Sequence, residues 1–135
     1  MFEFSFERQV EPEQLLPLFQ QTGWAGKRTL EGIRRMLAAT PVALGAWQDD
    51  RLVGFARAIT DGVYRALIDD VVVEKSVRGQ GVGSELIQRL TERLADVETV
   101  FLRCGENVAG FYEKHRFRRS KGLVLDLTQT QSGQE

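Results

Sequence analysis

Apolar and polar residues alternate along some stretches of the chain and recur at helical spacing along others, which separates predicted strands from predicted helices. Alternating or continuous apolar runs predict strands at residues 2–10, 42–47, 52–59, 66–73, 99–103, 117–120 and 123–127. Helical spacing predicts helices at residues 12–21, after Thr29, from a glycine-rich loop to about residue 96, and at residues 108–115. This order of elements predicts an α/β (α+β) protein with helices on both faces of a mixed sheet.

Local signals support several of these boundaries. Pro12 suits the first turn of a helix, and Thr29 and Asn107 are candidate helix caps. Asp49 and Asp50 stand between two apolar runs, which predicts a hairpin.

Composition limits the kinds of protein that the chain can be. Its 135 residues carry a net charge of −1, and no apolar run is long enough to span a bilayer. We expect one domain at residues 1–128 and a disordered polar tail at residues 129–135. The charge gives no global field for nucleic acid or an acidic membrane surface. One cysteine and one histidine exclude an internal disulfide and argue against a metal site, so we expect a cytoplasmic protein with no metal ion.

A glycine-rich segment at residues 71–84 joins an apolar strand to a helical pattern, an arrangement that binds phosphate groups. Glycines let the backbone approach an anion closely, and the first helical N–H groups then face it. A Walker A loop is excluded because Ser84 and Glu85, not lysine, follow Gly83. A dinucleotide loop is excluded because no third glycine stands at the required spacing after Gly79 or Gly81.

The pattern that remains is Arg-x-x-Gly-x-Gly, formed by Arg78, Gly81 and Gly83. It resembles the pyrophosphate-binding motif of the GNAT acetyltransferase superfamily. Residues 107–117 resemble a second motif of that family, in which Phe-Tyr and a lysine precede Gly-Phe, although Arg116 replaces the usual glycine. The resemblance covers residues 42–120 and implies the single-domain GNAT fold. That fold has a mixed, mostly antiparallel central sheet of six to seven strands and about four flanking helices.

The resemblance also implies acetyl-CoA as the co-substrate and assigns the residues that bind it. In the family, amides of the glycine loop hold the pyrophosphate. Amides at the end of the preceding strand polarise the thioester carbonyl, where a bulge opens a slot for the pantetheine arm. Carried onto this chain, the cofactor-binding residues are Val71, Val72, Val73, Arg78, Gly79, Gln80, Gly81, Val82, Gly83, Ser84 and Asn107, of which Asn107 reads equally as a helix cap.

Three residues are candidates for the chemistry. Tyr112 matches a family tyrosine that donates a proton to the CoA sulfur, although a tyrosine beside Phe111 also suits a core. Asp69 and Asp70 precede an apolar strand end, where burying a carboxylate is costly, and either one could bind or deprotonate an amine. Alternation places them on opposite faces of the sheet, so we expect only one to face the acceptor. The alternative is an aspartate that is satisfied by the backbone or by a basic neighbour.

Other residues have two interpretations each. Trp24 is a candidate wall of the acceptor site, together with Asp69, or else a core anchor. Cys104 reads as a small buried hydrophobe rather than a nucleophile, since nothing in the sequence places His115 beside it. Arg116 would be strained if its φ is positive.

The resemblance implies direct transfer of an acetyl group from acetyl-CoA to a bound primary amine. Residues 53–70 resemble the serotonin N-acetyltransferase-like branch, and the spacing from Asp70 to Arg78 resembles that of polyamine acetyltransferases. These features favour a small aromatic or alkyl amine. Acetylation of a protein N-terminus or lysine is an alternative, and non-catalytic binding of CoA is another. Dimers are common in the family, so a homodimer is a further expectation.

Overall fold

Five strands form one sheet in the order β1-β2-β3-β4-β5 in the computed structural model, which describes residues 1–130. The strands are β1 (Glu3–Ser5), β2 (Val42–Gln48), β3 (Arg51–Thr60), β4 (Arg65–Val73) and β5 (Thr99–Phe101). Neighbouring strands are antiparallel, except that β5 runs parallel to β4. The mixed sheet is confirmed, but the expected six to seven strands are wrong for the described residues.

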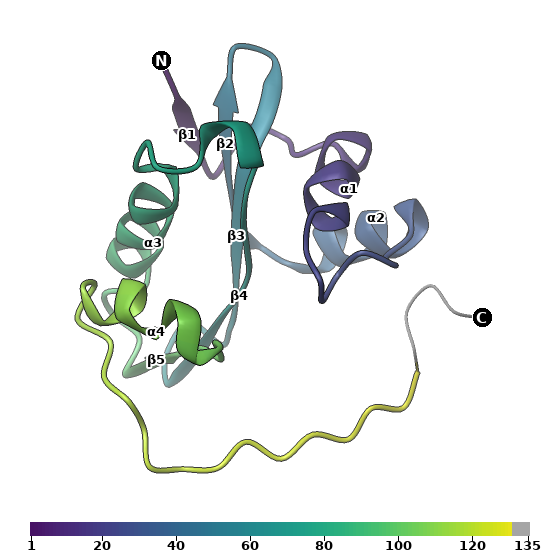
Figure 1. Cartoon of the computed structure of the whole chain (residues 1–135). Helices are drawn as coiled ribbons and strands as arrows, with labels where there is room; N and C mark the ends of the chain where they lie inside the picture. Colours follow the sequence, from purple (N-terminus) through teal and green to yellow (C-terminus); the bar gives the residue numbers. More distant parts are fainter. Residues whose placement is uncertain (131–135) are drawn as a thin grey trace.

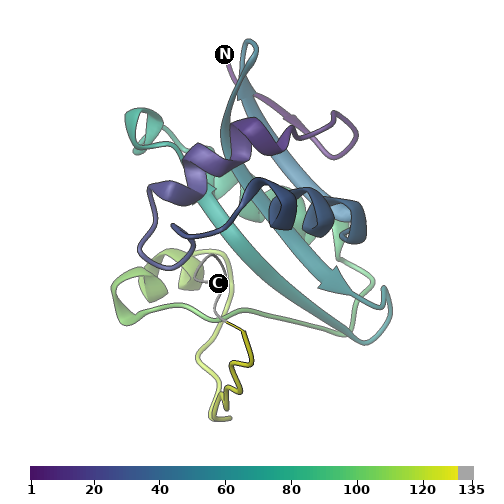
Figure 2. The same cartoon turned by 90° about the vertical axis from the view of Figure 1, so that its right-hand side faces the viewer.

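Helices cover both faces of the sheet, as predicted. They are α1 (Pro12–Gln20), α2 (Leu30–Ala39), α3 (Val82–Arg93) and α4 (Glu106–Glu113). Figure 1 shows α1 and α2 on one side of the sheet and α3 and α4 on the other. In the view of Figure 2, α1 and α2 lie in front of the strands.

Apolar stripes hold these helices on the sheet. Leu86, Ile87 and Leu90 of α3 are fully buried against one face. On the other face, the ring of Phe19 in α1 meets the ring of Phe55 in β3 edge-on, with centroids 6.4 Å apart. The two faces therefore have separate cores, and the central strands lie between them.

The predicted cap of α2 is confirmed. The Thr29 Oγ1 accepts a hydrogen bond from the Gly32 N–H at 3.0 Å, so α2 begins directly after Thr29. Such a bond satisfies one of the amides that the first helical turn leaves without a partner.

The predicted first strand at residues 2–10 is wrong beyond Ser5. The Ser5 Oγ accepts hydrogen bonds from the N–H groups of Glu7 at 3.0 Å and Arg8 at 2.8 Å. A side chain that binds the backbone ahead of it turns the chain and removes those amides from strand pairing. β1 therefore contributes only three residues to the sheet.

The predicted strands at residues 117–120 and 123–127 are also wrong, because neither segment is a strand in the structure. Leu123 and Leu125 are each 89% exposed, and the segment runs away from the body of the molecule after α4 (Figure 1). Arg119 pairs with Glu106 at 2.6 Å and Glu113 at 3.1 Å, which holds the start of the segment against α4, and the pair of Arg103 with Asp126 at 2.9 Å ties its end to the loop after β5. Alternation indicates a strand only if a partner strand is available, and the sequence pattern does not supply that partner. Residues 131–135 of the predicted tail lie outside the described part of the chain.

The close approach of α3 to β3 leads to a testable prediction about Gly54. A Cβ atom at Gly54 would lie 3.0 Å from Val82 Cγ1 and 3.3 Å from Leu86 Cδ1. We expect Gly54→Ala to lower the free energy of unfolding by about 1–3 kcal/mol, because the core must shift to accept the methyl group. Urea unfolding followed by circular dichroism measures the change.

Gly110→Ala is the matched control for that experiment. Gly110 lies within α4 and has no heavy atom within 4 Å of the position of a Cβ. Alanine favours the helix by about 0.5–1 kcal/mol over glycine, so this variant should keep or gain stability. Equal losses in the two variants would contradict the packing argument.

Candidate active site

The glycine-rich loop between β4 and α3 adopts a backbone that glycine alone adopts easily. Gly79 has φ +84° and Gly81 has φ +88°, both in the left-handed region. Gly81 is the N-cap of α3, so the amides of the first turn of α3 follow it directly. The first amides of a helix have no partner within the helix. The loop therefore presents N–H groups and the positive end of the α3 dipole, as the sequence predicts.

Glu74 fixes the start of this loop. Its N–H donates to the Val53 carbonyl at 2.8 Å, and its carboxylate accepts hydrogen bonds from the Ser76 N–H at 3.1 Å and the Ser76 Oγ at 2.7 Å. The hydrogen bonds from Ser76, and then the charge of Arg51, lower the pKa of Glu74. Glu74 is thus an ionised anchor that holds the short 3-10 turn at Lys75–Val77 against β3.

The predicted bulge is present in β4. Phe55 pairs with Val72 and Arg57 pairs with Asp69, so Ala56 alone faces two residues of β4. Asp70 is one of these two residues, and its φ of +58° is left-handed, which is uncommon for a residue with a side chain. An extra residue of this kind bends a strand and interrupts its hydrogen-bond ladder.

The bulge also reverses the alternation of side chains along β4. Before the bulge, Ala66 and Ile68 belong to the core on the α3 side, whereas after it Val71 and Val73 pack there. Val72 belongs to the core beneath α1 and α2. The three predicted valines therefore stay in the sheet, with their side chains divided between its two faces.

β4 and β5 diverge before the bulge is reached. Their parallel pairing covers Arg65 to Leu67 of β4 and Thr99 to Phe101 of β5, and no pairing follows it among the described residues. The end of β4, from Ile68 to Val73, therefore has β3 on one edge and no strand on the other. Backbone groups on this open edge lie directly before the glycine-rich loop.

α4 packs on the start of α3. A Cβ at Gly83 would lie 3.5 Å from the Cζ of Phe111, so the absence of a side chain at Gly83 lets the Phe111 ring approach. One turn later, the His115 Nε2 lies 3.3 Å from the Ser84 Oγ. The two predicted motifs are therefore in direct contact.

Tyr112 lies in an aromatic cluster with its phenol half-buried. Its ring meets the ring of Phe111 with centroids 5.0 Å apart and the ring of Phe117 with centroids 6.0 Å apart. Burial, followed by the negative charges of Cys104 and Asp69, raises the pKa of Tyr112 to about 12. The phenol thus keeps its proton at neutral pH and lies close to Asp69.

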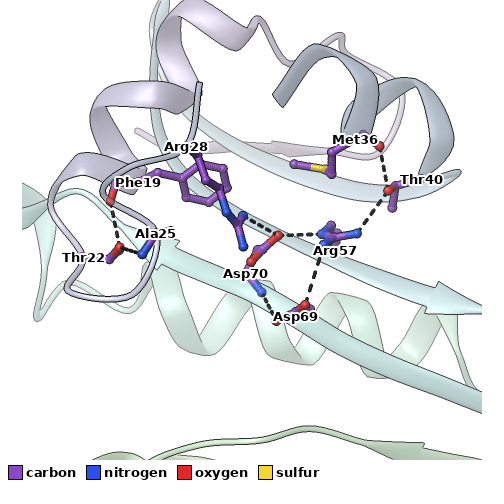
Figure 3. Close-up of polar contacts among 9 residues, drawn as sticks. All are labelled: Phe19, Thr22, Ala25, Arg28, Met36, Thr40, Arg57, Asp69 and Asp70. Carbon is purple, nitrogen blue, oxygen red and sulfur yellow. Dashed lines mark hydrogen bonds and ion pairs between the residues drawn. The ribbon is translucent and has the colours of Figure 1, made fainter. Parts of the chain in front are cut away.

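The expectation that Asp69 and Asp70 lie on opposite faces is wrong, because the bulge interrupts the alternation between them. Figure 3 shows both carboxylates beside Arg57. Asp70 Oδ2 lies 2.6 Å from Arg57 Nε, and Asp69 Oδ2 lies 3.6 Å from Arg57 Nη2. The side chain of Asp70 is fully buried, whereas that of Asp69 is 44% exposed.

Arg28 completes this cluster from the loop between α1 and α2. Its Nη1 lies 3.0 Å from Asp70 Oδ2, so two guanidinium groups share one buried carboxylate oxygen (Figure 3). The other oxygen, Oδ1, is buried without a hydrogen-bond partner. The Arg28 guanidinium also lies over the rings of Phe19, at 4.6 Å, and Trp24, at 5.9 Å.

Sequence analysis missed both arginines. Arg57 stands between Ala56 and Ala58 in an otherwise apolar strand, and that isolation was the available signal. A buried charge in a strand usually has a partner of opposite charge. Nothing in the local pattern marks Arg28, because its partner Asp70 is 42 positions away and only the fold brings them together.

Comparison with known proteins identifies the family. The family model described as "Acetyltransferase (GNAT) family" matches residues 3–117. The chain belongs to the GNAT acetyltransferase family. It is 34% identical over 131 residues to an uncharacterised ycf52-like N-acetyltransferase of Prochlorococcus marinus, covering 93% of this chain and 69% of that protein.

Two further relatives agree with this assignment. A chloroplastic serotonin N-acetyltransferase 2 of Oryza sativa subsp. japonica is 32% identical over 127 residues, covering 87% of this chain and 62% of that protein. A crystal structure of an acetyltransferase from Deinococcus radiodurans R1 superposes with a TM-score of 0.78 at 32% identity, covering 93% of this chain and 87% of that one. GNAT proteins are acyltransferases that use acetyl-CoA as co-substrate, and this chain shares their fold.

Four other predictions about the GNAT chain have clear outcomes. Trp24 is 59% exposed, so its interpretation as a core anchor is wrong. Asn107 does not cap α4, because the helix begins at Glu106, before Asn107, and Gly105 is its N-cap. Cys104 is exposed in the loop after β5 rather than buried. Arg116 has φ +73°, which confirms the left-handed backbone that its glycine-like position suggested.

Two hollows lie beside α2 in the GNAT structure. The larger, of about 420 Å³, is formed by the start of the chain and the end of α2, and none of the predicted site residues lines it. The smaller, of about 210 Å³, is lined by Arg28, Gly32, Ile33, Met36 and Arg57. Within residues 1–130 no cluster of three or more metal-ligating side chains occurs. The same residues contain no helix with the length and hydropathy needed to cross a membrane.

The raised pKa of Tyr112 gives a direct spectroscopic prediction. At pH 11, in folded protein, we expect Tyr112 to remain undissociated, so Tyr112→Phe should leave the tyrosinate absorbance near 295 nm unchanged. Because the pKa of Tyr112 in the folded protein lies above the ordinary value of a tyrosine, the protonated phenol favours the folded state. This contribution to the free energy of unfolding is present below about pH 10 and is lost as the pH rises through 12.

Tyr64, the other tyrosine, is 62% exposed and provides the control. Tyr64→Phe is the matched loss of one phenol, and circular dichroism at pH 11 must report folded protein in both variants. A loss of absorbance in Tyr112→Phe would contradict the buried, protonated phenol.

Proposed function

We propose that this chain transfers an acetyl group from acetyl-CoA directly to a small primary amine, aromatic or alkyl. The observation that carries the proposal is the arrangement at the end of β4. There the bulge and the open strand edge lead directly into the glycine-rich loop, and α4, which carries Tyr112, packs on the helix that follows that loop. The similarity to a serotonin N-acetyltransferase of rice supports a small amine as the acceptor.

The loop residues suit the pyrophosphate of CoA. Acetyl-CoA, when bound, supplies the activated thioester. No heavy atom lies within 4 Å of the position of a Cβ at Gly79 or Gly81, so the space over the loop is open. Backbone amides from Arg78 to Ser84, together with the dipole of α3, would hold the anion there. The Nε–H of Arg78 donates to the Val73 carbonyl at 3.0 Å, which holds the guanidinium against the end of β4.

Val71, Val72 and Val73 contribute through their backbone. Amides on the open edge of β4 would donate to the thioester oxygen as negative charge develops on it. One preorganised donor of this kind lowers a barrier by about 3 kcal/mol. Asn107, exposed at the start of α4, is a further contact for the CoA arm.

Tyr112 and Asp69 handle the protons in this proposal. Asp69 is the partly exposed carboxylate of the pair, so it accepts the proton that the attacking amine loses, through water. The amine nitrogen forms a bond to the acetyl carbon, and the carbon–sulfur bond breaks. Tyr112, kept protonated by its burial, donates its proton to the departing thiolate and regains one from solvent.

We propose that Asp70 does not bind or deprotonate the amine, the role for which it was a candidate in the sequence. Its carboxylate is fully buried and bound by two arginines, so it has little access to a substrate proton. We assign it as a positioning residue that holds Arg28 and Arg57 at the edge of the acceptor site. Trp24, exposed beside Arg28, is a candidate wall of that site. The homodimer and the cytoplasmic location stay predictions.

Tyr112→Phe tests the proposed acid. We expect kcat for acetyl transfer to fall about 10²-fold at neutral pH, because the thiolate loses its proton donor. The affinity for acetyl-CoA should stay within about twofold. Release of free CoA, measured with a thiol reagent against 2-phenylethylamine, serotonin, spermidine and a lysine peptide, gives kcat, and calorimetry gives the affinity.

Tyr64→Phe, far from the loop, should leave both quantities unchanged. An unchanged kcat in Tyr112→Phe, with chemistry shown to limit the rate, would remove Tyr112 from the mechanism. Turnover with the peptide alone would favour the protein acetyltransferase alternative. Tight binding of acetyl-CoA without thiol release for any amine would favour a CoA-binding module.

A further inference from the structure

The small cavity under α2 has an unusual lining. Its polar side chains are the two guanidinium groups of Arg28 and Arg57, and its apolar wall is formed by Ile33 and Met36. Neither carboxylate of the cluster lines it. The lining thus offers hydrogen-bond donors and positive charge, and no side-chain acceptor for an ammonium group.

Arg57 has little capacity left for a ligand. Its Nε donates to Asp70 at 2.6 Å, its Nη1 donates to the Thr40 Oγ1 at 3.3 Å, and its Nη2 faces Asp69 at 3.6 Å. Thr40 is fixed in turn by a hydrogen bond to the Met36 carbonyl at 2.8 Å (Figure 3). Arg57 is therefore a fixed part of the wall.

Arg28 is different, because only one of its nitrogens has an acceptor in the described residues, namely Nη1 with Asp70. Its side chain is 28% exposed and rests on Phe19 and Trp24, which limits the positions that it can take. A guanidinium group with unused N–H groups, held over aromatic rings at the edge of a cavity, suits a planar anion.

We propose that the amine acceptor of this enzyme carries a carboxylate group, which Arg28 binds at this cavity. This inference rests on the proposed acetyl transfer to an amine. Asp70 and Asp69 together offset the formal charges of Arg28 and Arg57, so the carboxylate is held by hydrogen bonds from the unused N–H groups of Arg28 and not by an excess of positive charge. The apolar part of the acceptor then packs against Ile33 and Met36.

This arrangement separates the two ends of the acceptor. Asp69 pairs with Arg57 from the opposite strand and lies near Tyr112, outside the lining of the cavity. The carboxylate of the acceptor is held at Arg28, and its amine extends toward Asp69 and the open edge of β4. An amine without a carboxylate loses the first of these two contacts.

Matched pairs of amines test the inference with the full chain. L-Phenylalanine is compared with 2-phenylethylamine, and 6-aminohexanoate with hexylamine, so that each pair differs in the carboxylate. We expect kcat/KM to be at least tenfold higher for the carboxylate member of at least one pair. Equal values, or a preference for the amine without a carboxylate in both pairs, would overturn the inference.

Substitution of Arg28 locates the effect. In Arg28→Met, kcat/KM for the preferred carboxylate amine should fall at least tenfold more than kcat/KM for its matched amine. Arg35→Met, the same change at an exposed arginine of α2, is the control and should alter none of these values. Arg28→Lys keeps the charge beside buried Asp70 and provides a folded comparison if Arg28→Met is unstable. In the lysine variant, the logarithm of the kcat/KM ratio between the carboxylate amine and its matched amine should fall by roughly half, because lysine lacks the guanidinium fork.

Binding measured without turnover separates the two levels of the proposal. Calorimetry with 6-aminohexanoate and hexylamine, whose amine lies at the far end of the chain from the carboxylate, reports the carboxylate contact whether or not acetylation occurs. Tighter binding of 6-aminohexanoate that Arg28→Met abolishes supports the inference even if acetyl transfer to amines fails. Turnover with amines, without a carboxylate preference and with Arg28→Met neutral, overturns the inference and leaves the proposed function standing.

Discussion

A fully buried carboxylate within a β-sheet needs partners of opposite charge. The two arginines that pair with Asp70 determine how the first two helices and their loop lie on the sheet. Removing an ion from water costs several kcal/mol unless an opposite charge and hydrogen bonds replace the lost solvation. Arg57 reaches Asp70 from β3 and Arg28 reaches it from the loop between the first two helices. The ion pairs therefore bind that loop to the centre of the sheet, where apolar packing alone would leave its position less defined.

The same residue forms the bulge of β4, so one irregularity has effects on both faces. On the face beneath α1 and α2, the extra residue brings the two neighbouring carboxylates to one arginine. On the face of α3, it turns Val71 and Val73 into the core just before the glycine-rich loop. Left-handed backbone at an aspartate costs on the order of 1–3 kcal/mol. The ion pairs offset that cost, which makes the bulge and the arginine cluster mutually dependent.

Features that depend on local sequence were predictable. The glycine-rich loop, the helix that follows it and the Thr29 cap need only neighbouring residues to form, and the structure has all three. Features that depend on contacts between distant segments were not predictable. The faces of the sheet on which Asp69 and Asp70 lie depend on a bulge, which the alternation of apolar and polar residues does not reveal. The role of Arg28 depends on its ion pair with Asp70, which only the fold brings about. The segment at residues 123–127 is an apolar run of the kind that forms strands, but it has no partner strand in the described residues, so the local pattern alone was insufficient.

The division of the chain between its two sites has a consequence for evolution. The proposed donor site lies at residues 71–117, whereas the cavity beside Arg28 is formed by residues 28–57. The two regions meet at the β4 bulge. Substitutions at Arg28, Ile33 or Met36 can therefore alter the acceptor without disturbing the glycine-rich loop. Descendants of one such enzyme would keep a recognisable donor motif while their metabolic roles drift apart, and a shared motif would then be poor evidence of a shared acceptor.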